Sequence, residues 1–234
     1  MSNLNKKWIN LVFVIDKSGS MWSSESDVVG GFNKTIEEQK AIEDGKVTVS
    51  MFTFDSTVHE LYIGKDINDL PKFEYHADGM TALNDGCGTA IDSVGKWLHD
   101  KDVAGEEMPG TTMVVVMTDG MENNSKEYTL KQVQDKIKEQ TEKYSWQFIY
   151  MGTDITTTKA ADDLGFKFKT FGSRAKFAKN YDIINCATTA YRSAVNTGET
   201  LAFASATLDS VLLKETTNNT ADYEKEIGQK LSTD

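Results

Sequence analysis

Two short apolar runs that each lead into an aspartate constrain the fold of this chain more than any other feature. Leu11–Ile15 runs directly into Asp16, and Met113–Met117 is followed by Thr118 and Asp119. Continuous apolar runs of this length are typical of strands that are covered on both faces in a parallel sheet. They are also far shorter than the roughly 20 residues that cross a bilayer, so we expect no membrane span.

Further strands and helices alternate along the sequence. Strands are predicted at Val47–Phe54, Trp146–Met151 and Phe166–Lys169, and Val58–Ile63 is predicted to form an antiparallel edge strand beside the first of these. Helical spacing of apolar residues predicts helices at residues 28–42, 83–98, 129–144 and 175–195, with one more after Thr156. This alternation predicts an α/β fold with a doubly wound, mostly parallel sheet. Ligands of such folds bind at the carboxyl ends of the strands.

The length and composition suit one large domain with a short extension. The chain has 234 residues, of which 39% are hydrophobic. We expect one domain over residues 1–195 and a partly helical extension over 196–234 that can pack on it. In this extension Leu201–Leu213 is predicted to be a short helix, and Asn218–Asp234 is polar enough to fray.

Charge and the start of the chain exclude several classes of partner. Lys and Arg number 25 against 36 Asp and Glu, a net charge of −11. Nucleic acids and anionic membranes both favour a basic surface, so neither is expected as a partner, whereas cations are. No secretory apolar region follows the first residues, which predicts a cytoplasmic protein in which Cys87 and Cys186 are reduced thiols.

Oxygen-bearing side chains gather at the predicted strand ends. Asp16, Ser18 and Ser20 lie two residues apart in a loop that contains glycine, so a carboxylate and two hydroxyls can face one point. Asp119 is expected on the same rim, and Thr81 supplies a further hydroxyl from a loop that precedes a predicted helix. Hard oxygen ligands of this kind suit Mg²⁺ or Mn²⁺.

These motifs resemble those of the von Willebrand factor A domain, whose metal-ion-dependent adhesion site combines an Asp-x-Ser-x-Ser loop with a distant Thr and a distant Asp. Phe13–Met21, Gly79–Leu83 and Thr118–Asn123 are most similar to stand-alone bacterial and phage proteins of this type, and the resemblance covers about residues 8–195. It implies a Rossmann-like fold and a bound Mg²⁺, with Mn²⁺ or Ca²⁺ as alternatives. The residues that match the metal site are Asp16, Ser18, Ser20, Thr81 and Asp119.

The expected function is the metal-dependent capture of a protein partner. Ser18, Ser20 and Thr81 would bind the ion directly or nearly so, whereas Asp16 and Asp119 would act through water or by positioning other ligands. Hydroxyls are weak ligands and Mg²⁺ retains exchangeable waters, so an exposed Glu or Asp of a partner can displace one. By analogy with the family, an AAA-type ATPase or a phage assembly component is the expected kind of partner.

Two alternatives to capture of a partner are consistent with these residues. An assembly or structural protein with an accessory metal site would carry the same fold, and a Mg²⁺-dependent hydrolase would use two carboxylates and a metal. No His, Lys or Cys in the motifs stands out as a base or nucleophile, so we expect no enzyme. His59, His76 and His99 are dispersed in the sequence without zinc spacing.

Two residues near the motifs have structural explanations that compete with a role in binding. Asp85 falls in the first turn of a predicted helix, where an anion complements the helix dipole, and this is favoured over a role as a metal ligand. Trp22 follows the Asp16 loop, and it either anchors a partner or packs against the helix that starts near Val28.

Overall fold

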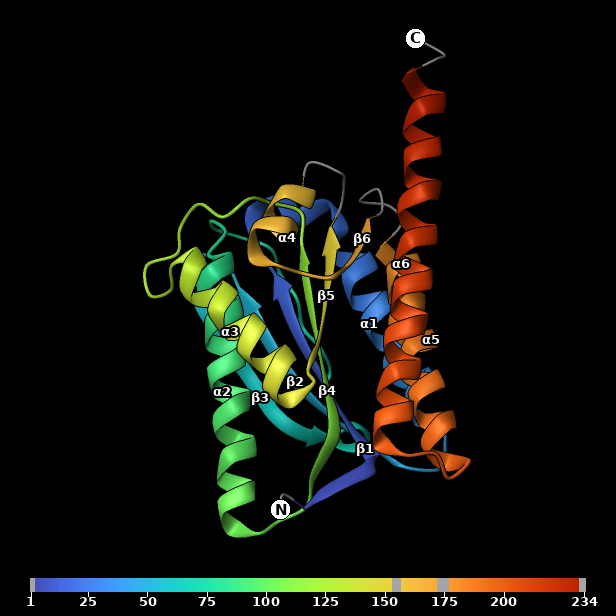
Figure 1. Ribbon diagram of the computed structural model, residues 1–234. Helices are drawn as coiled ribbons and strands as arrows, with labels where there is room; N and C mark the ends of the chain where they lie inside the picture. Colours follow the sequence, from blue (N-terminus) through green and yellow to red (C-terminus); the bar gives the residue numbers. More distant parts are fainter. Residues whose placement is uncertain (1–2, 153–156, 172–176, 232–234) are drawn as a thin grey trace.

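The computed structural model describes residues 3–152, 157–171 and 177–231, and its strands and helices alternate along most of that length (Figure 1). The strands are β1 (Leu4–Asp16), β2 (Lys46–Phe54), β3 (Val58–Asp66), β4 (Met108–Thr118), β5 (Gln147–Gly152) and β6 (Phe168–Phe171). The α-helices are α1 (Glu25–Lys40), α2 (Leu83–Ala104), α3 (Leu130–Tyr144), α4 (Thr158–Leu164), α5 (Phe177–Asn196) and α6 (Leu201–Leu231). Two short 3-10 helices, η1 (Gly19–Ser24) and η2 (Ile67–Asp69), follow β1 and β3.

The strands form one sheet that is parallel except at one edge. In the described residues its order is β3-β2-β1-β4-β5-β6, and β3 runs antiparallel to β2 while the other neighbours are parallel. The predicted fold class and the antiparallel edge strand are therefore confirmed. After β1, the chain adds β2 and β3 on one side of β1, and it then adds β4, β5 and β6 on the other side. The direction in which strands are added therefore reverses between β1 and β4. Ligand sites of open α/β sheets lie at such a point.

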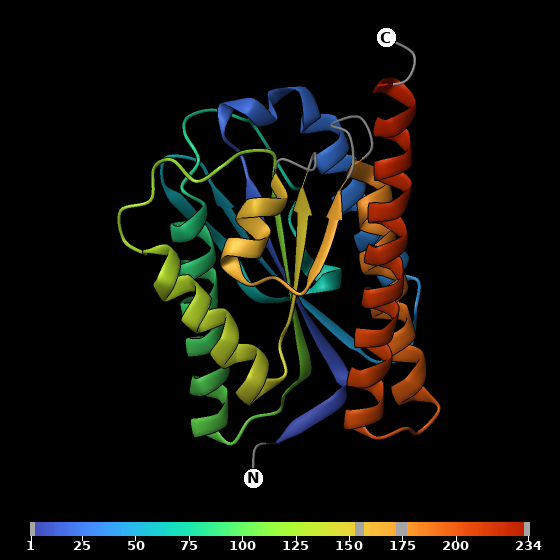
Figure 2. The ribbon, with the colours of Figure 1, turned by 45° about the horizontal axis from the view of Figure 1, so that its top comes forward.

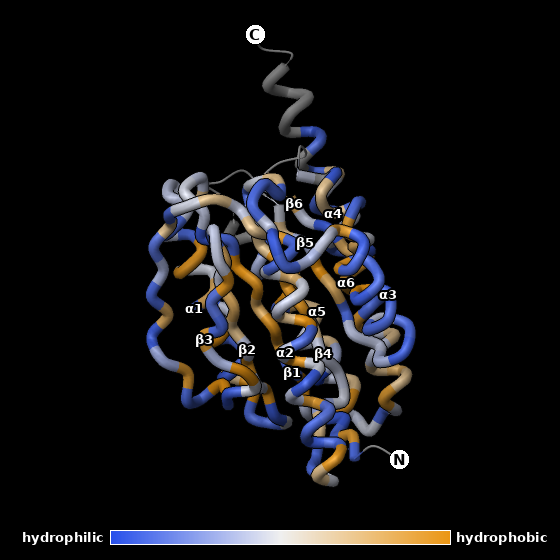
Figure 3. The backbone as a smooth tube through the Cα atoms, turned by 90° about the vertical axis from the view of Figure 1, so that its left-hand side faces the viewer, coloured by the Kyte–Doolittle hydropathy of each residue, from blue (hydrophilic) through white to orange (hydrophobic). Residues whose placement is uncertain are grey.

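Helices cover both faces of the sheet (Figure 2), and β1 contributes residues to the hydrophobic core on each face. Leu11, Phe13 and Ile15 pack in a cluster with residues of α1, α5 and α6. Val12 and Val14 point the other way and pack in a second cluster with residues of α2, α3 and α4. Because successive side chains of a strand point to opposite faces, burial on both sides explains the uninterrupted apolar run. Hydropathy mapped on the backbone places the apolar strands inside and most of the hydrophilic segments outside (Figure 3).

The main difference from the predicted elements is the length of the last helix. It was expected to end near Leu213, but α6 continues to Leu231 and projects beyond the body of the fold (Figure 1). Its buried stripe extends past that point to Thr216, which is 5% exposed, and Oδ1 of Asn219 accepts a hydrogen bond from the backbone N–H of Phe171 at 2.6 Å. This hydrogen bond from β6, and a second from the Asn219 amide to Oδ1 of Asn180 in α5 at 3.4 Å, hold a segment whose composition predicts fraying.

None of the helices in the described residues is both long and apolar enough to span a membrane.

Candidate metal centre

All five residues predicted to form the metal site lie at the carboxyl edge of the sheet, in three loops. Ile15 of β1 pairs with Met117 of β4, so the residues that follow them emerge side by side. Asp16 ends β1, and Asp119 directly follows β4. Thr81 lies two residues before α2. The strand register thus gathers groups that are far apart in the sequence.

Asp16 is fully buried and uses both of its carboxylate oxygens. Oδ1 accepts the backbone N–H of Ser18 at 2.7 Å, and Oδ2 accepts the hydroxyl of Thr118 at 2.6 Å. Burial raises the pKa of Asp16 to about 6, and the nearby charge of Asp119 adds to this, while the two hydrogen bonds oppose it. A buried carboxylate held in this way shapes the loop that follows β1.

A chain of polar contacts joins the first loop to the third. The hydroxyls of Ser18 and Ser20 lie 3.2 Å apart, and the Ser20 hydroxyl donates to Oδ1 of Asp119 at 2.5 Å. Ser18 is 2% exposed and Asp119 is 9% exposed, whereas Ser20 belongs to the exposed residues. The cluster therefore opens to solvent at Ser20 and is enclosed behind it.

Thr81 reaches the same place from the second loop. A Cβ added to Gly120 would lie 3.1 Å from Oγ1 of Thr81 and 3.8 Å from Oγ of Ser20, so both hydroxyls border the backbone of Gly120. The backbone N–H of Thr81 donates to Oδ1 of Asn123 at 2.9 Å, which fixes the second loop to the third. The structure thus brings the five predicted residues together.

Backbone contacts fix the first loop against the second. The N–H of Gly19 donates to the carbonyl of Gly79 at 3.1 Å, and the N–H of Asp78 donates to the carbonyl of Lys17 at 2.7 Å. Gly79 has a φ of +81°, a conformation in which a residue with a side chain is strained. Gly79 thus provides the turn that carries Thr81 to the cluster.

Two further carboxylates organise the third loop, and sequence reasoning missed this role. Glu122 accepts the backbone N–H of Asn84 at 2.8 Å and those of Asn124 and Ser125 at 2.9 and 2.7 Å. Asp85 accepts the backbone N–H groups of residues 126, 127 and 128 at 2.8–3.0 Å. Asp85 does lie in the first turn of α2. Its hydrogen bonds also tie the third loop to that helix.

The loop before α2 is also anchored to the Asp16 loop by residues that the sequence did not single out. The hydroxyl of Tyr75 donates to the backbone carbonyl of Asp16 at 2.5 Å. Oε1 of Glu25 accepts the backbone N–H of Ala77 at 2.6 Å. A long, irregular segment is thereby held against the first loop and the start of α1.

Lys17 and the histidines lie outside the oxygen cluster, the name used here for the group formed by Asp16, Ser18, Ser20, Thr81 and Asp119. The amine of Lys17 pairs with Asp55 at 2.6 Å, and Nε2 of His59 lies 3.5 Å from the same carboxylate. His76 pairs with Glu25 at 3.3 Å. Although they are dispersed in the sequence, His59 and His76 line one pocket of about 360 Å³ beside Lys17.

Each of the three loops carries a large apolar side chain that is exposed beside the cluster. Trp22, Met80 and Met121 are 70%, 50% and 63% exposed. Trp22 therefore keeps most of its surface in solvent. Exposed apolar groups around a polar centre are typical of surfaces that bind a partner.

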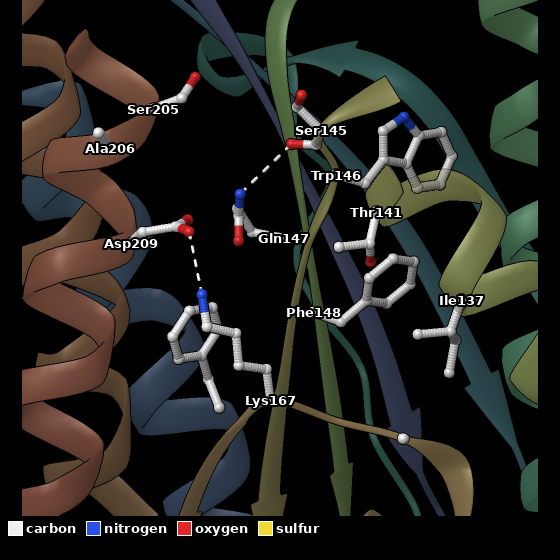
Figure 4. A pocket seen from close by; sticks show the side chains of 12 residues that line it. Ile137, Thr141, Ser145, Trp146, Gln147, Phe148, Lys167, Ser205, Ala206 and Asp209 are labelled. Atoms are coloured by element: carbon white, nitrogen blue, oxygen red, sulfur yellow. Dashed lines mark hydrogen bonds and ion pairs between the residues drawn. The ribbon is translucent and has the colours of Figure 1, made fainter. Parts of the chain in front are cut away.

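A separate pocket lies at the opposite end of β5 and β6. It has a volume of about 350 Å³ and lies between α3, α6 and the starts of these two strands (Figure 4). Lys167 pairs with Asp209 of α6 across it at 3.2 Å, and the amide of Gln147 donates to the carbonyl of Ser145 at 3.4 Å. Because β5 and β6 start here, this pocket is distinct from the cluster at the carboxyl edge.

The oxygen cluster fits a hard divalent cation better than a soft one. In the described part of the chain, no three His, Cys, Asp or Glu side chains are grouped so that they could share a metal. The cluster instead combines two carboxylates with three hydroxyls. Mg²⁺ accepts such a set because it is commonly bound through one or two carboxylates and retains several waters.

Comparison with known sequence families gives one match. A model of the von Willebrand factor type A domain matches residues 10–154. This range includes the second half of β1, all of β2 to β5, and the three loops that form the oxygen cluster.

Solved structures share the fold at low sequence identity. Proximal thread matrix protein 1 of the mussel byssus is 15% identical with a TM-score of 0.57, over 76% of this chain and 45% of that protein. The pilus adhesin SpaC of Lactobacillus rhamnosus GG is 13% identical with a TM-score of 0.57, over 79% of this chain and 30% of that one. A second structure of the mussel protein, 16% identical with a TM-score of 0.53 over 76% of this chain and 45% of that one, has a zinc-occupied MIDAS motif. This chain thus spans less than half the length of these proteins.

Proposed function

The chain belongs to the von Willebrand factor type A domain family, and from this premise we propose that its oxygen cluster holds a divalent cation and captures a carboxylate of a partner protein. The family consists of protein-interaction and adhesion modules. Mg²⁺ is the proposed ion, with Mn²⁺ or Ca²⁺ as alternatives.

The contact between Ser20 and Asp119 carries this proposal. The 2.5 Å distance between the Ser20 hydroxyl and Oδ1 of Asp119, together with the 3.2 Å distance between the Ser18 and Ser20 hydroxyls, links oxygens of three of the proposed site residues. Ser18, Ser20 and Thr81 would hold the ion directly. Asp16 would position the loop, since the Ser18 N–H and the Thr118 hydroxyl already occupy both of its oxygens.

The chemistry expected of the cluster is recognition. A divalent cation held by hydroxyls and water supplies a coordination position that an anionic oxygen can take. Ser20 and Gly19 are exposed, while Asp16, Ser18 and Thr81 are buried behind them, so a partner would approach from the Ser20 side. The zinc-occupied motif of the mussel protein supports metal binding at such a site in this fold.

Metal binding by the purified chain tests the first half of the proposal. Isothermal titration with Mn²⁺ and with Mg²⁺ should give one site in the wild type and no heat in Asp119→Asn. Thr81→Ser should retain binding and Thr81→Ala should weaken it, because only the serine keeps a hydroxyl. Equal affinities in wild type and Asp119→Asn would show that the metal binds elsewhere.

Capture of a partner tests the second half. The resemblance found in the sequence makes an AAA-type ATPase or a phage assembly component of the cytoplasm the proposed kind of partner. A protein that co-purifies with the wild type in Mg²⁺, and is released both by EDTA and by Thr81→Ala, would fit the proposal. A partner retained equally in EDTA would place the interface on another surface.

A further inference from the structure

A small apolar pocket, here called the side pocket, lies directly beside the oxygen cluster. It has a volume of about 190 Å³, and Leu83, Met121, Leu130, Ala160 and Leu164 form its apolar lining. Leu83 begins α2 two residues after Thr81, and Met121 directly follows Gly120, against which the Thr81 hydroxyl packs. The side pocket and the cluster therefore share the same two loops.

The size of the side pocket suits one side chain rather than a whole small-molecule ligand. Its volume of about 190 Å³ is below the roughly 300 Å³ at which pockets for drug-sized ligands begin. Met121 is 63% exposed and Leu130 is 38% exposed, so these two walls of the pocket face solvent. Covering them removes apolar surface from water, which favours binding of an aliphatic or aromatic group.

The charged residues of the side pocket are already engaged within the chain. The carboxylate of Glu122 accepts the N–H groups of Asn84, Asn124 and Ser125. The amine of Lys159 lies 3.7 Å from the carboxylate of Asp163, the other charge in the lining. A charged group in the pocket would lose its own hydration and meet the engaged carboxylate of Glu122, whereas an apolar group would lose no favourable hydration.

The charge of the surroundings also restricts what can bind. Asp16, Asp119 and Glu122 lie in or beside the cluster, and the whole chain has a net charge of −11. One carboxylate can be accepted where it meets a cation, but a second carboxylate beside it would face like charges. Charge complementarity therefore favours a single acidic residue with uncharged neighbours.

We propose that the partner presents one Asp or Glu next to a large apolar residue, and that this apolar side chain occupies the side pocket while the carboxylate meets the cation. The inference rests on the proposed function and adds the class of ligand that the same site selects. It assigns Met121 and Leu130 to ligand selection and leaves metal binding to the oxygen cluster.

A library of random displayed peptides provides the probe. The full chain is immobilised with Mg²⁺, and bound peptides are released with EDTA and sequenced. We expect enriched peptides to share one Asp or Glu within a few residues of Leu, Ile, Met or Phe. A synthetic copy of an enriched peptide should bind about tenfold more weakly when its apolar residue becomes Ser, because burial of a side chain of that size contributes at least that factor.

Variants of the pocket separate this inference from the proposed function. Met121→Ser and Leu130→Ser should each lower the affinity for the parent peptide about tenfold. Each should also remove most of the difference in affinity between the parent peptide and its Ser derivative. Val103→Ser is the matched control, since Val103 is 73% exposed near the far end of α2. Mn²⁺ affinity should be unchanged in all three variants, because none of them alters an oxygen of the cluster.

Each outcome has a distinct meaning. Peptides that require Mg²⁺ and one carboxylate but tolerate Ser at every other position would overturn the role of the side pocket and leave the proposed function standing. A library without enrichment in Mg²⁺ would overturn both. Loss of peptide binding in Val103→Ser equal to that in Met121→Ser would also contradict the assignment.

Discussion

The hydroxyl of Ser20 lies 2.5 Å from Oδ1 of Asp119, although 99 positions separate the two residues in the sequence. The contact joins the loop after β1 to the loop after β4, and it requires these two central strands to be in register. A metal bound at this contact would therefore bind the folded chain and not the unfolded one. Its binding energy would add to the stability of the fold.

The first prediction concerns this link between metal and stability. Mg²⁺ or Mn²⁺ at one hundred times its dissociation constant should raise the free energy of unfolding by about 2.7 kcal/mol, which a thermal melt detects as a higher Tm. Ser20→Ala should lose most of the rise, because it removes the hydroxyl between Ser18 and Asp119. Ser23→Ala is the control, since Ser23 is an exposed residue of the same 3-10 helix. An identical rise in all three proteins would exclude the cluster as the metal site.

The second prediction separates the structural role of Asp16 from its charge. Asp16→Ala leaves the buried N–H of Ser18 without its acceptor, at a cost of about 1–3 kcal/mol for a group left unsatisfied, and leaves the Thr118 hydroxyl only the Gly120 carbonyl at 3.3 Å. Asp16→Asn keeps an oxygen of the same shape for Ser18, and its amide can donate to Thr118. Chemical denaturation without metal should therefore give a higher free energy of unfolding for Asp16→Asn than for Asp16→Ala. Equal stabilities would mean that neither hydrogen bond contributes.

The sequence indicated the five cluster residues because their motif depends on spacing within short loops that follow buried strands. Asp16 and Asp119 could be placed on one rim, since each follows an apolar run. The roles of Thr118, Gly120 and Glu122 were not predicted, although all three lie near the Asp119 motif. Their contacts depend on how the loops fold against one another, and no local pattern encodes this.

The third prediction tests the packing around Gly120. A methyl group at this position would lie 3.1 Å from the Thr81 hydroxyl, closer than most Cβ contacts. Gly120→Ala should move that hydroxyl and lower Mn²⁺ affinity about tenfold, as changes beside metal ligands commonly do. Gly30→Ala in α1 is the control, because a Cβ there meets nothing within 4 Å. Isothermal titration compares the two, and unchanged affinity in Gly120→Ala would contradict the role given to the close packing of Gly120 against Thr81.

The fourth prediction concerns the link between the third loop and α2. Asp85 accepts three backbone N–H groups and is 7% exposed, so Asp85→Asn replaces charge-assisted hydrogen bonds with weaker ones. We expect a loss of about 1–3 kcal/mol in the free energy of unfolding. Asp100→Asn on the same helix should change little, because its ion pair with Lys96 is exposed. Hydrogen exchange at residues 126–128 should increase in Asp85→Asn alone, and unchanged exchange would contradict the role given to Asp85.

The full length of the C-terminal helix α6 could not be predicted from its composition. Its first half, Leu201–Leu213, was predicted to be a short helix, and Leu208 and Leu212 are buried in it. Its second half is polar, and the hydrogen bond from Phe171 to Asn219 joins residues 48 positions apart. A polar segment held by such long-range hydrogen bonds cannot be distinguished from a fraying tail by its sequence alone.

The last prediction separates the packing of α6 from the oxygen cluster. Leu208 is fully buried where α6 lies against the rest of the fold, so Leu208→Ala should lower the free energy of unfolding by about 2–5 kcal/mol. Leu213→Ala is the control, because Leu213 lies on the same helix and is 54% exposed. Both variants should bind Mn²⁺ with wild-type affinity at a temperature where they are folded, since the cluster lies in loops that α6 does not supply. A selective loss of metal binding in folded Leu208→Ala would instead show that α6 supports the geometry of the cluster.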